Sequence, residues 1–165
     1  RMLYTLILYG FQQQIRFNTN HGFNNPIGSR WFNECLLSKF ITFARCSKSK
    51  NVEYLNVSFE RLIDQITPDT FVYADPPYRS TLGVYNDGKR GFEGWTIEHE
   101  QRLCLFLDQI HQREAKFMLS YVIQVEDFYN ADVANWAERN GYHVIDIKVP
   151  QGRYNNRREV LIINY

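Results

Sequence analysis

The sequence is poor in cysteine and has no long hydrophobic run. Its 165 residues include three cysteines, which lie far apart and show no Cys-x-x-Cys spacing. This argues against a disulfide framework or a cysteine-based zinc site, so the reducing cytoplasm is the expected compartment. The longest apolar run, Met2 to Phe11, is too short to cross a bilayer, and no signal-peptide pattern precedes it. The chain is therefore predicted to be a single folded domain by length, without a membrane segment.

Charge is nearly balanced overall but unevenly distributed. The net charge is +1, yet residues 1–50 carry seven Lys or Arg side chains and one acid, a net charge of +6, while residues 51–165 carry −5. A basic third in a neutral chain favours a partner with phosphates. Charge alone fits an ordinary solvated surface equally well.

Residues 1–50 differ in composition from the rest of the chain. Met2 to Phe11 predicts a buried helix. Gln12 to Asn33 is polar, aromatic and rich in Asn and Gly, which accept the backbone angles of turns and hairpins. Lys48 to Asn51 is a polar joint. We therefore expect one region over 1–50, a helix plus a polar hairpin, and a second over 51–165.

Residues 51–165 alternate between predicted strands and helices. Short apolar segments predict strands at Val52–Val57, Phe71–Ala74, Lys116–Val122, Tyr142–Val149 and Val160–Ile163. A helical turn is expected at Phe59–Gln65, and helices from the Thr96 cap to about Arg113 and from about Asp127 to a Gly141 C-cap. This order predicts an α/β fold with a largely parallel sheet.

Asp75-Pro76-Pro77-Tyr78 follows one of these strands directly. Open α/β sheets place ligands at the carboxyl ends of their strands. Two consecutive prolines have no N–H to donate, so the loop offers only carbonyl and carboxylate acceptors in a rigid frame. Such acceptors suit an exocyclic amino group, and Tyr78 supplies a flat face for a planar base. The alternative is a strand that ends in a tight turn, with the Asp as a local cap.

Four stretches together resemble one family. FVYADPPY is similar to the catalytic motif of Dam-type adenine-specific DNA methyltransferases, which use S-adenosylmethionine. IRFNTNHGFNNPIG (residues 15–28) resembles the family's target-recognition hairpin, AKFMLS (115–120) its next strand, and RYNNRREVLIINY (153–165) its closing pattern. The resemblance covers nearly the whole chain in order. It implies the C-terminal part of a Rossmann-like sheet with an inserted DNA-recognition hairpin region.

The resemblance also implies a mechanism. A target adenine is flipped out of double-stranded DNA, and Asp75 and the Pro76 carbonyl accept hydrogen bonds from its amino group, with Pro77 completing the rigid loop. Tyr78 stacks on the base, and Asp75 also contacts the cofactor. The methyl group moves by direct in-line displacement, for which no metal is expected.

The same comparison points to side chains that would contact DNA. Arg can read guanine and Asn can read adenine in the major groove, and Arg also neutralises phosphates. The candidates are Arg16, Asn18, Asn24, Arg30, Arg153, Arg157 and Arg158.

The chain departs from the family pattern in three ways. It has no Phe-x-Gly-x-Gly cofactor loop, and the glycines at 83, 88, 91 and 94 follow the Asp75 loop, where we interpret them as a flap. Ser120 precedes Tyr121 where the family often has Ser-Asn, so no role is transferred there. The chain also begins with Arg1. We therefore expect the first strands to be missing and the Phe71–Ala74 strand to form an uncovered edge.

These departures leave alternatives open. A second chain or a missing N-terminal segment would complete the sheet, and the 165 residues alone are expected to bind S-adenosylmethionine weakly or not at all. The leading hypothesis is a DNA adenine methyltransferase of a restriction–modification system, with a restriction endonuclease as an expected partner. The alternatives are a non-catalytic DNA-binding remnant, one subunit of a split methyltransferase, and an enzyme acting on an amino group in RNA or protein.

Overall fold

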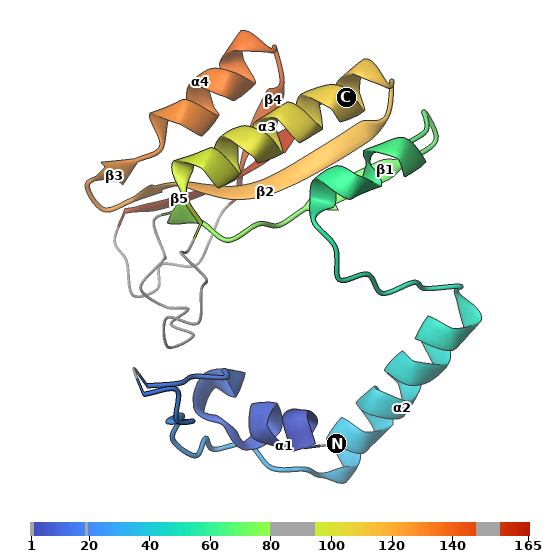
Figure 1. The fold of residues 1–165 in the computed structure, drawn as a ribbon, viewed down its shortest axis with the longest axis vertical. Helices are drawn as coiled ribbons and strands as arrows, with labels where there is room; N and C mark the ends of the chain where they lie inside the picture. The colour runs from blue at the N-terminus through green and yellow to red at the C-terminus, as the bar shows by residue number, and fades with distance from the viewer. Residues whose placement is uncertain (1, 19, 80–94, 148–155) are drawn as a thin grey trace. The chain divides into compact units, whose positions relative to one another are not determined.

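A computed structural model describes residues 2–18, 20–79, 95–147 and 156–165 (Figure 1). The chain divides into two compact units, one over residues 2–56 and the other from residue 57 onward. Each unit is described by itself.

Two helices form most of the first unit. α1 (Met2–Tyr9) confirms the helix expected there, but only Leu8 is buried, so the prediction of a buried helix is wrong. The helix is apolar all round, and within its unit it packs on α2 (Glu34–Ser49) through one side, with the Tyr4 and Phe40 rings 5.4 Å apart. The other sides of α1 stay exposed within this unit.

The helix α2 was not predicted from the sequence. Its start carries a recognisable signal, because the Asn33 side chain accepts a hydrogen bond from the Leu36 N–H at 2.9 Å. Between the two helices lie the short η1 (Phe11–Gln13) and a segment with two isolated antiparallel bridges, Gly10 to Ile27 and Phe17 to Phe23. Over its described residues this segment contains no regular strand, so the expected hairpin remains a prediction.

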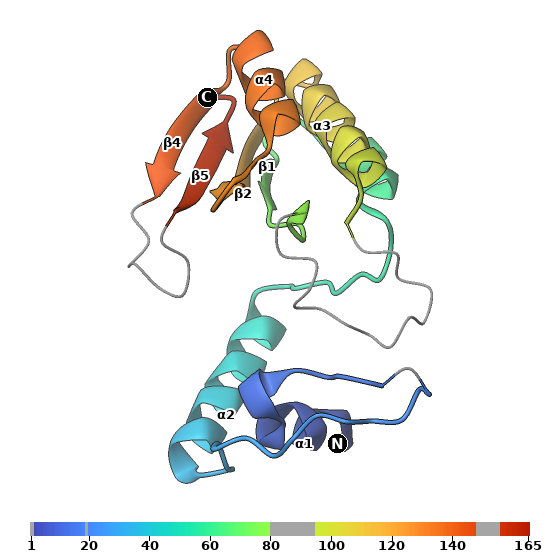
Figure 2. The ribbon, with the colours of Figure 1, turned by 90° about the vertical axis from the view of Figure 1, so that its left-hand side faces the viewer.

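The second unit has a mixed α/β fold, with a sheet and helices. Its sheet contains β1 (Phe71–Ala74), β2 (Lys116–Val125), β3 (Phe128–Tyr129), β4 (His143–Ile147) and β5 (Arg157–Ile163). The strand order is β1-β2-β5-β4 (Figure 2). β3 pairs with β2 off this path. Of the described pairings only β1–β2 is parallel, and the other three are antiparallel.

The expectation of a largely parallel sheet is therefore wrong. β5 runs back beside β4 and fills the position between β4 and β2, so these two strands point the same way without pairing. The predicted strand at Val52–Val57 is also wrong. Residues 52–56 form no strand and their large apolar side chains are exposed, because no described strand offers them a partner.

α3 (Ile97–Gln112) and α4 (Ala131–Arg139) lie on one face of the sheet (Figure 2). Thr96 caps α3 in a capping box with His99, and Gly141 follows α4 with φ of +69°, as predicted. α4 begins later than expected because β3 occupies residues 128–129, and Asn130 is its cap. The 3₁₀ segment η2 (Phe59–Gln65) matches the predicted helical turn.

The core lies between these helices and the sheet. Leu107 and Ile110 of α3, Trp136 of α4, and Phe117 and Leu119 of β2 are all buried. β1 lies at the edge of the described sheet, and its alternate side chains, Phe71 and Tyr73, are more than half exposed. The uncovered edge expected from the sequence is thus confirmed among the described strands.

Candidate functional site

Asp75, Pro76, Pro77 and Tyr78 directly follow β1, at the carboxyl end of the β1–β2 pair, which is parallel. Ala74 pairs with Leu119, so the loop leaves the sheet beside Ser120. Asp75 and Pro77 are exposed, whereas Pro76 and Tyr78 are half-buried. The structure therefore presents a short loop of accessible acceptors where an α/β sheet places its ligands.

Tyr78 and Asp75 are bonded to each other. The Tyr78 hydroxyl donates a hydrogen bond to Asp75 Oδ1 at 2.7 Å, and the Tyr78 ring meets the Tyr121 ring edge-on, with centroids 5.3 Å apart. Burial, reinforced by the Asp75 hydrogen bond, raises the pKa of Tyr78 to about 12. Tyr78 is therefore a neutral phenol at physiological pH, and it holds the Asp75 carboxylate in one orientation.

A buried polar cluster lies behind this loop. Glu100 of α3 is 2% exposed and accepts hydrogen bonds from the Tyr121 hydroxyl and, at 2.7 Å, from the Asn130 side chain. Its Oε2 lies 3.3 Å from Arg79 Nε. Burial raises the pKa of Glu100, an effect that Tyr121 and Arg79 oppose. Burial and Glu100 likewise raise the pKa of Tyr121.

Sequence reasoning missed this cluster. Glu100 looks like an acid in the first turn of a helix, where it would complement the helix dipole in solvent. Its partners Tyr121 and Asn130 are 21 and 30 residues away, so only the fold brings them together. The one available signal is Tyr121 itself, a tyrosine in a largely apolar strand, whose hydroxyl requires a partner when it is buried.

Three of the expected DNA-contacting residues lie close together in the first unit. Arg16 Nε donates to Asn24 Oδ1 at 3.3 Å, and Arg16 Nη2 donates to the Asn24 carbonyl at 3.3 Å. Asn18 Oδ1 accepts from the backbone N–H groups of Asn20 and Gly22, at 3.0 and 2.8 Å. In this structure Asn18 therefore shapes a turn, and Arg16 and Asn24 orient each other.

The other candidates are separated. Arg30 lies beside Trp31 at a shallow hollow next to α2. Arg157 pairs with Glu159, and Arg158 pairs with Asp146 across the strands, with Nη2 and Oδ2 3.1 Å apart. Arg153 lies outside the described residues, as do the glycines of the expected flap.

The register places the start of β5 at the same end of the sheet as the Asp75 loop. Ala74 pairs with Leu119 of β2, whereas Arg158 and Arg157 lie opposite Gln124 and Val125, further toward the carboxyl end of that strand. Two cationic side chains thus share an end of the sheet with the loop. Both already have acidic partners, which reduces the net positive charge there.

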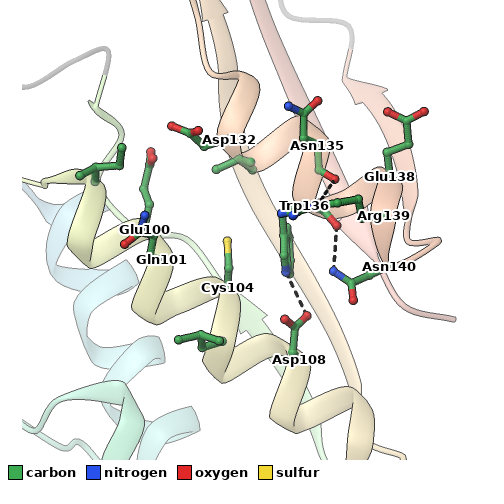
Figure 3. Close-up of a pocket in the computed structure, with 13 residues that line it drawn as sticks. Glu100, Gln101, Cys104, Asp108, Asp132, Asn135, Trp136, Glu138, Arg139 and Asn140 are labelled. Atoms are coloured by element: carbon green, nitrogen blue, oxygen red, sulfur yellow. Dashed lines mark hydrogen bonds between the residues drawn. The ribbon is translucent and has the colours of Figure 1, made fainter.

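The second unit also contains a hollow that the loop does not line. A groove of about 890 Å³ runs between α3 and α4 (Figure 3). One of its acids, Asp108, is engaged, since it accepts hydrogen bonds from Trp136 Nε1 and the Tyr142 hydroxyl, both at 2.9 Å. None of the residues 75–78 lines it.

Among the described residues, no group of three or more His, Cys, Asp or Glu side chains is placed to hold a metal ion. No helix in that part of the chain is long and apolar enough to cross a membrane.

Comparison with known proteins agrees with the resemblance seen in the motifs. Residues 2–156 match the family described as D12 class N6 adenine-specific DNA methyltransferase. The chain is 38% identical over 166 residues to the modification methylase LlaI of Lactococcus lactis subsp. lactis, covering 99% of this chain and 26% of that protein. It is 36% identical over 170 residues to the type II methyltransferase M.FokI of Planomicrobium okeanokoites, with the same coverage.

The modification methylase StsI of Streptococcus sanguinis is 32% identical over 172 residues, again over 99% of this chain and 26% of the relative. The chain thus spans about a quarter of the length of the curated relatives it matches. With a family match over nearly all of its residues, the chain belongs to the D12 class N6 adenine-specific DNA methyltransferases.

Proposed function

We propose that this chain carries the target-base site and part of the DNA-binding surface of a methyltransferase that modifies adenine in a specific sequence of double-stranded DNA. The methyl donor is S-adenosylmethionine. The observation that supports this most directly is the Asp75–Tyr78 loop at the carboxyl end of β1, with Tyr78 bonded to Asp75 at 2.7 Å. The alternative reading, a tight turn capped by its Asp, gives no role to the exposed acceptors.

The loop suits the chemistry of an exocyclic amino group. The nitrogen lone pair of adenine is delocalised into the ring, and hydrogen bonds from both amino hydrogens to Asp75 and the Pro76 carbonyl help to localise it on nitrogen. Pro77, without an N–H, adds no backbone donor that would compete for these acceptors. The nitrogen then forms its bond to the methyl carbon as the sulfur–carbon bond breaks, and Asp75 passes the released proton to water.

Tyr78 has two tasks in this proposal. Its ring stacks on the flipped base, while its hydroxyl keeps one oxygen of Asp75 oriented. A carboxylate oxygen has two acceptor sites, so Asp75 can accept from Tyr78 and from the adenine amino group together.

S-Adenosylmethionine supplies an electrophilic methyl group when bound. Asp75 could contact the positively charged part of S-adenosylmethionine, because Asp75 is an exposed carboxylate at the carboxyl end of the strands. The described residues offer only this contact. The rest of the cofactor site is assigned to the remainder of a longer protein or to a second chain, either of which would pair with the exposed edge strand β1.

The first region, residues 1–50, is assigned to target recognition. Arg16, Asn18 and Asn24 lie within one loop whose side chains are already ordered by mutual hydrogen bonds. Arg30, Arg153, Arg157 and Arg158 are proposed to contact the duplex as well. Residues 51–165 form the catalytic region.

The relatives named as modification methylases support a place in a restriction–modification system. A restriction endonuclease that cuts the same sequence is the partner such a system requires. An enzyme that modifies the DNA of its own cell would act in the cytoplasm, which is the compartment we assign to it.

The test is methyl transfer from labelled S-adenosylmethionine to duplex DNA by the complete protein that contains this chain. Asp75→Ala should reduce transfer by at least about 100-fold, the scale of losing one transition-state hydrogen-bonding group, while DNA binding changes little. Asp64→Ala removes a carboxylate whose side chain is 91% exposed and serves as the matched control.

Full transfer by Asp75→Ala would refute the proposed role of this loop. DNA binding by the wild type without any transfer would instead favour the non-catalytic remnant. Methylation of RNA or protein but not DNA would favour the third reading.

A further inference from the structure

Arg79, the residue after the Asp75–Tyr78 loop, points inward although it carries a charge. Its side chain is 18% exposed. Nε lies 3.3 Å from Glu100 Oε2, Nη1 lies 3.3 Å from Asp132 Oδ2, and the guanidinium sits 5.5 Å from the centre of the Phe128 ring. Three groups from α3, α4 and β3 therefore hold this one side chain.

The partners of Arg79 are themselves fixed. Glu100 is anchored by Tyr121 of β2 and by Asn130, and Asn130 also caps α4 by accepting from the Val133 N–H at 3.2 Å. A buried carboxylate is costly unless it is paired and hydrogen-bonded, so Arg79 and Glu100 each stabilise the other in place. Arg79 thus attaches the end of the loop after β1 to α3 and α4.

Arg79 is linked through a single peptide bond to Tyr78, and through Tyr78 to Asp75, the two proposed base-binding residues. Tyr78 precedes Arg79 in the chain, bonds to Asp75, and leans on the Tyr121 ring, whose hydroxyl also reaches Glu100. Arg79 therefore contacts Glu100, Tyr78 contacts Tyr121, and Glu100 and Tyr121 are bonded to each other. A shift of Arg79 would move both the stacking ring and the carboxylate that it orients.

We propose that Arg79 is a positioning residue that fixes the Asp75–Tyr78 loop for methyl transfer through its contacts with Glu100 and Asp132. This rests on the proposed function of the loop. The alternative is that Arg79 binds a DNA phosphate. Its low exposure and its two carboxylate partners argue against that role, because both carboxylates would have to be given up first.

The experiment compares Arg79→Met with wild type in the complete protein. Three quantities are measured: the single-turnover rate of transfer in the preformed complex with duplex DNA and S-adenosylmethionine, the Kd for DNA, and the melting temperature. We expect the rate to fall by about 10- to 100-fold, the cost of a small misplacement of reacting groups, with the DNA Kd within about threefold. Arg79→Lys should recover part of the rate, because lysine keeps the charge but lacks the planar fork that reaches two carboxylates.

Arg113→Met is the matched control. Arg113 also forms an ion pair with an acid, Asp64, but the pair is exposed, with 3.7 Å between its atoms, and it lies away from the loop. Its loss should leave the transfer rate unchanged. If Arg79→Met does not fold, Asp132→Asn decides, because Asp132 is 59% exposed and its neutral replacement removes one ion pair of Arg79 without opening the core.

The outcomes separate the two proposals. No methyl transfer by the wild type would refute the proposed function itself. An active wild type with an unchanged rate in Arg79→Met, or in Asp132→Asn where that variant decides, would overturn only the positioning role. Weaker DNA binding with an unchanged single-turnover rate would assign Arg79 to DNA contact and overturn it equally.

Discussion

The sharpest test of the proposed base site is to separate the ring of Tyr78 from its hydroxyl. Tyr78→Phe keeps the ring against Tyr121 and removes only the 2.7 Å hydrogen bond to Asp75. Hydrogen bonds to charged groups contribute about 1.5–3 kcal/mol when shielded, but Asp75 is exposed and water competes, so a value of about 1 kcal/mol is appropriate. One kcal/mol corresponds to a rate loss of roughly fivefold.

Tyr78→Ala removes the ring as well. Stacking of a base on an aromatic side chain contributes about 1–3 kcal/mol, so the total loss rises to about 2–4 kcal/mol. The expected reduction in rate is roughly 30- to 1,000-fold, well beyond that of the Phe variant. The assay is single-turnover methyl transfer by the complete protein at saturating DNA and cofactor.

Tyr73→Phe is the control, because Tyr73 is an exposed tyrosine of β1 five residues before Tyr78. Its rate should equal that of the wild type. A Phe variant at position 78 as slow as the Ala variant would refute the assignment of the ring as the stacking platform.

Two further predictions concern the titratable groups of Glu100 and Cys104. Burial raises the pKa of Glu100 above its ordinary 4.5, so the stability this group contributes is present below about pH 4.5 and is lost as the pH rises through the folded-state pKa. The melting temperature of Glu100→Gln should therefore exceed that of the wild type by an amount that grows from acid to neutral pH. The variant should nevertheless transfer methyl groups more slowly, because Arg79 loses a charged partner. A difference in melting temperature that shrinks toward neutral pH would contradict this. Burial raises the pKa of Cys104 to about 12, whereas Cys35 and Cys46 are exposed in α2. Cys104 is half-buried, so peptide mapping after thiol labelling at pH 8 should find Cys35 and Cys46 modified well before Cys104, with the difference lost in denaturant. Labelling of Cys104 as fast as that of Cys35 and Cys46 would contradict this.

Local signals were predicted well from the sequence. Thr96 and Gly141 mark the ends of helices because a cap depends on the side chain and backbone of a few neighbouring residues. The Asp75–Tyr78 loop was found for the same reason, as two prolines and an apolar strand define it locally. Its placement at the end of β1 matches the expectation.

Long-range features were not predictable in this way. Nothing in the composition of Arg157–Ile163 says that it will lie between β2 and β4, because strand order depends on which partners the whole chain offers. The burial of α1 was misjudged since an apolar sequence shows what a helix could bury, not what is present to cover it. Glu100 was missed because its function as an anchor depends on Tyr121, Asn130 and Arg79, which come from three other segments.

The position of β5 also constrains how the chain acquires its structure. β5 is made after β4, yet it pairs both with β4 and with β2, and β2 begins about 40 positions before β5. Until residues 157–163 leave the ribosome, β2 and β4 have no shared neighbour, and each exposes backbone groups able to pair with another chain. Assembly of this sheet is therefore a late and non-local event, of the kind that folds slowly and is prone to aggregation. A substitution that weakens β5 should lower the yield of folded protein during synthesis before it changes any property of the finished enzyme.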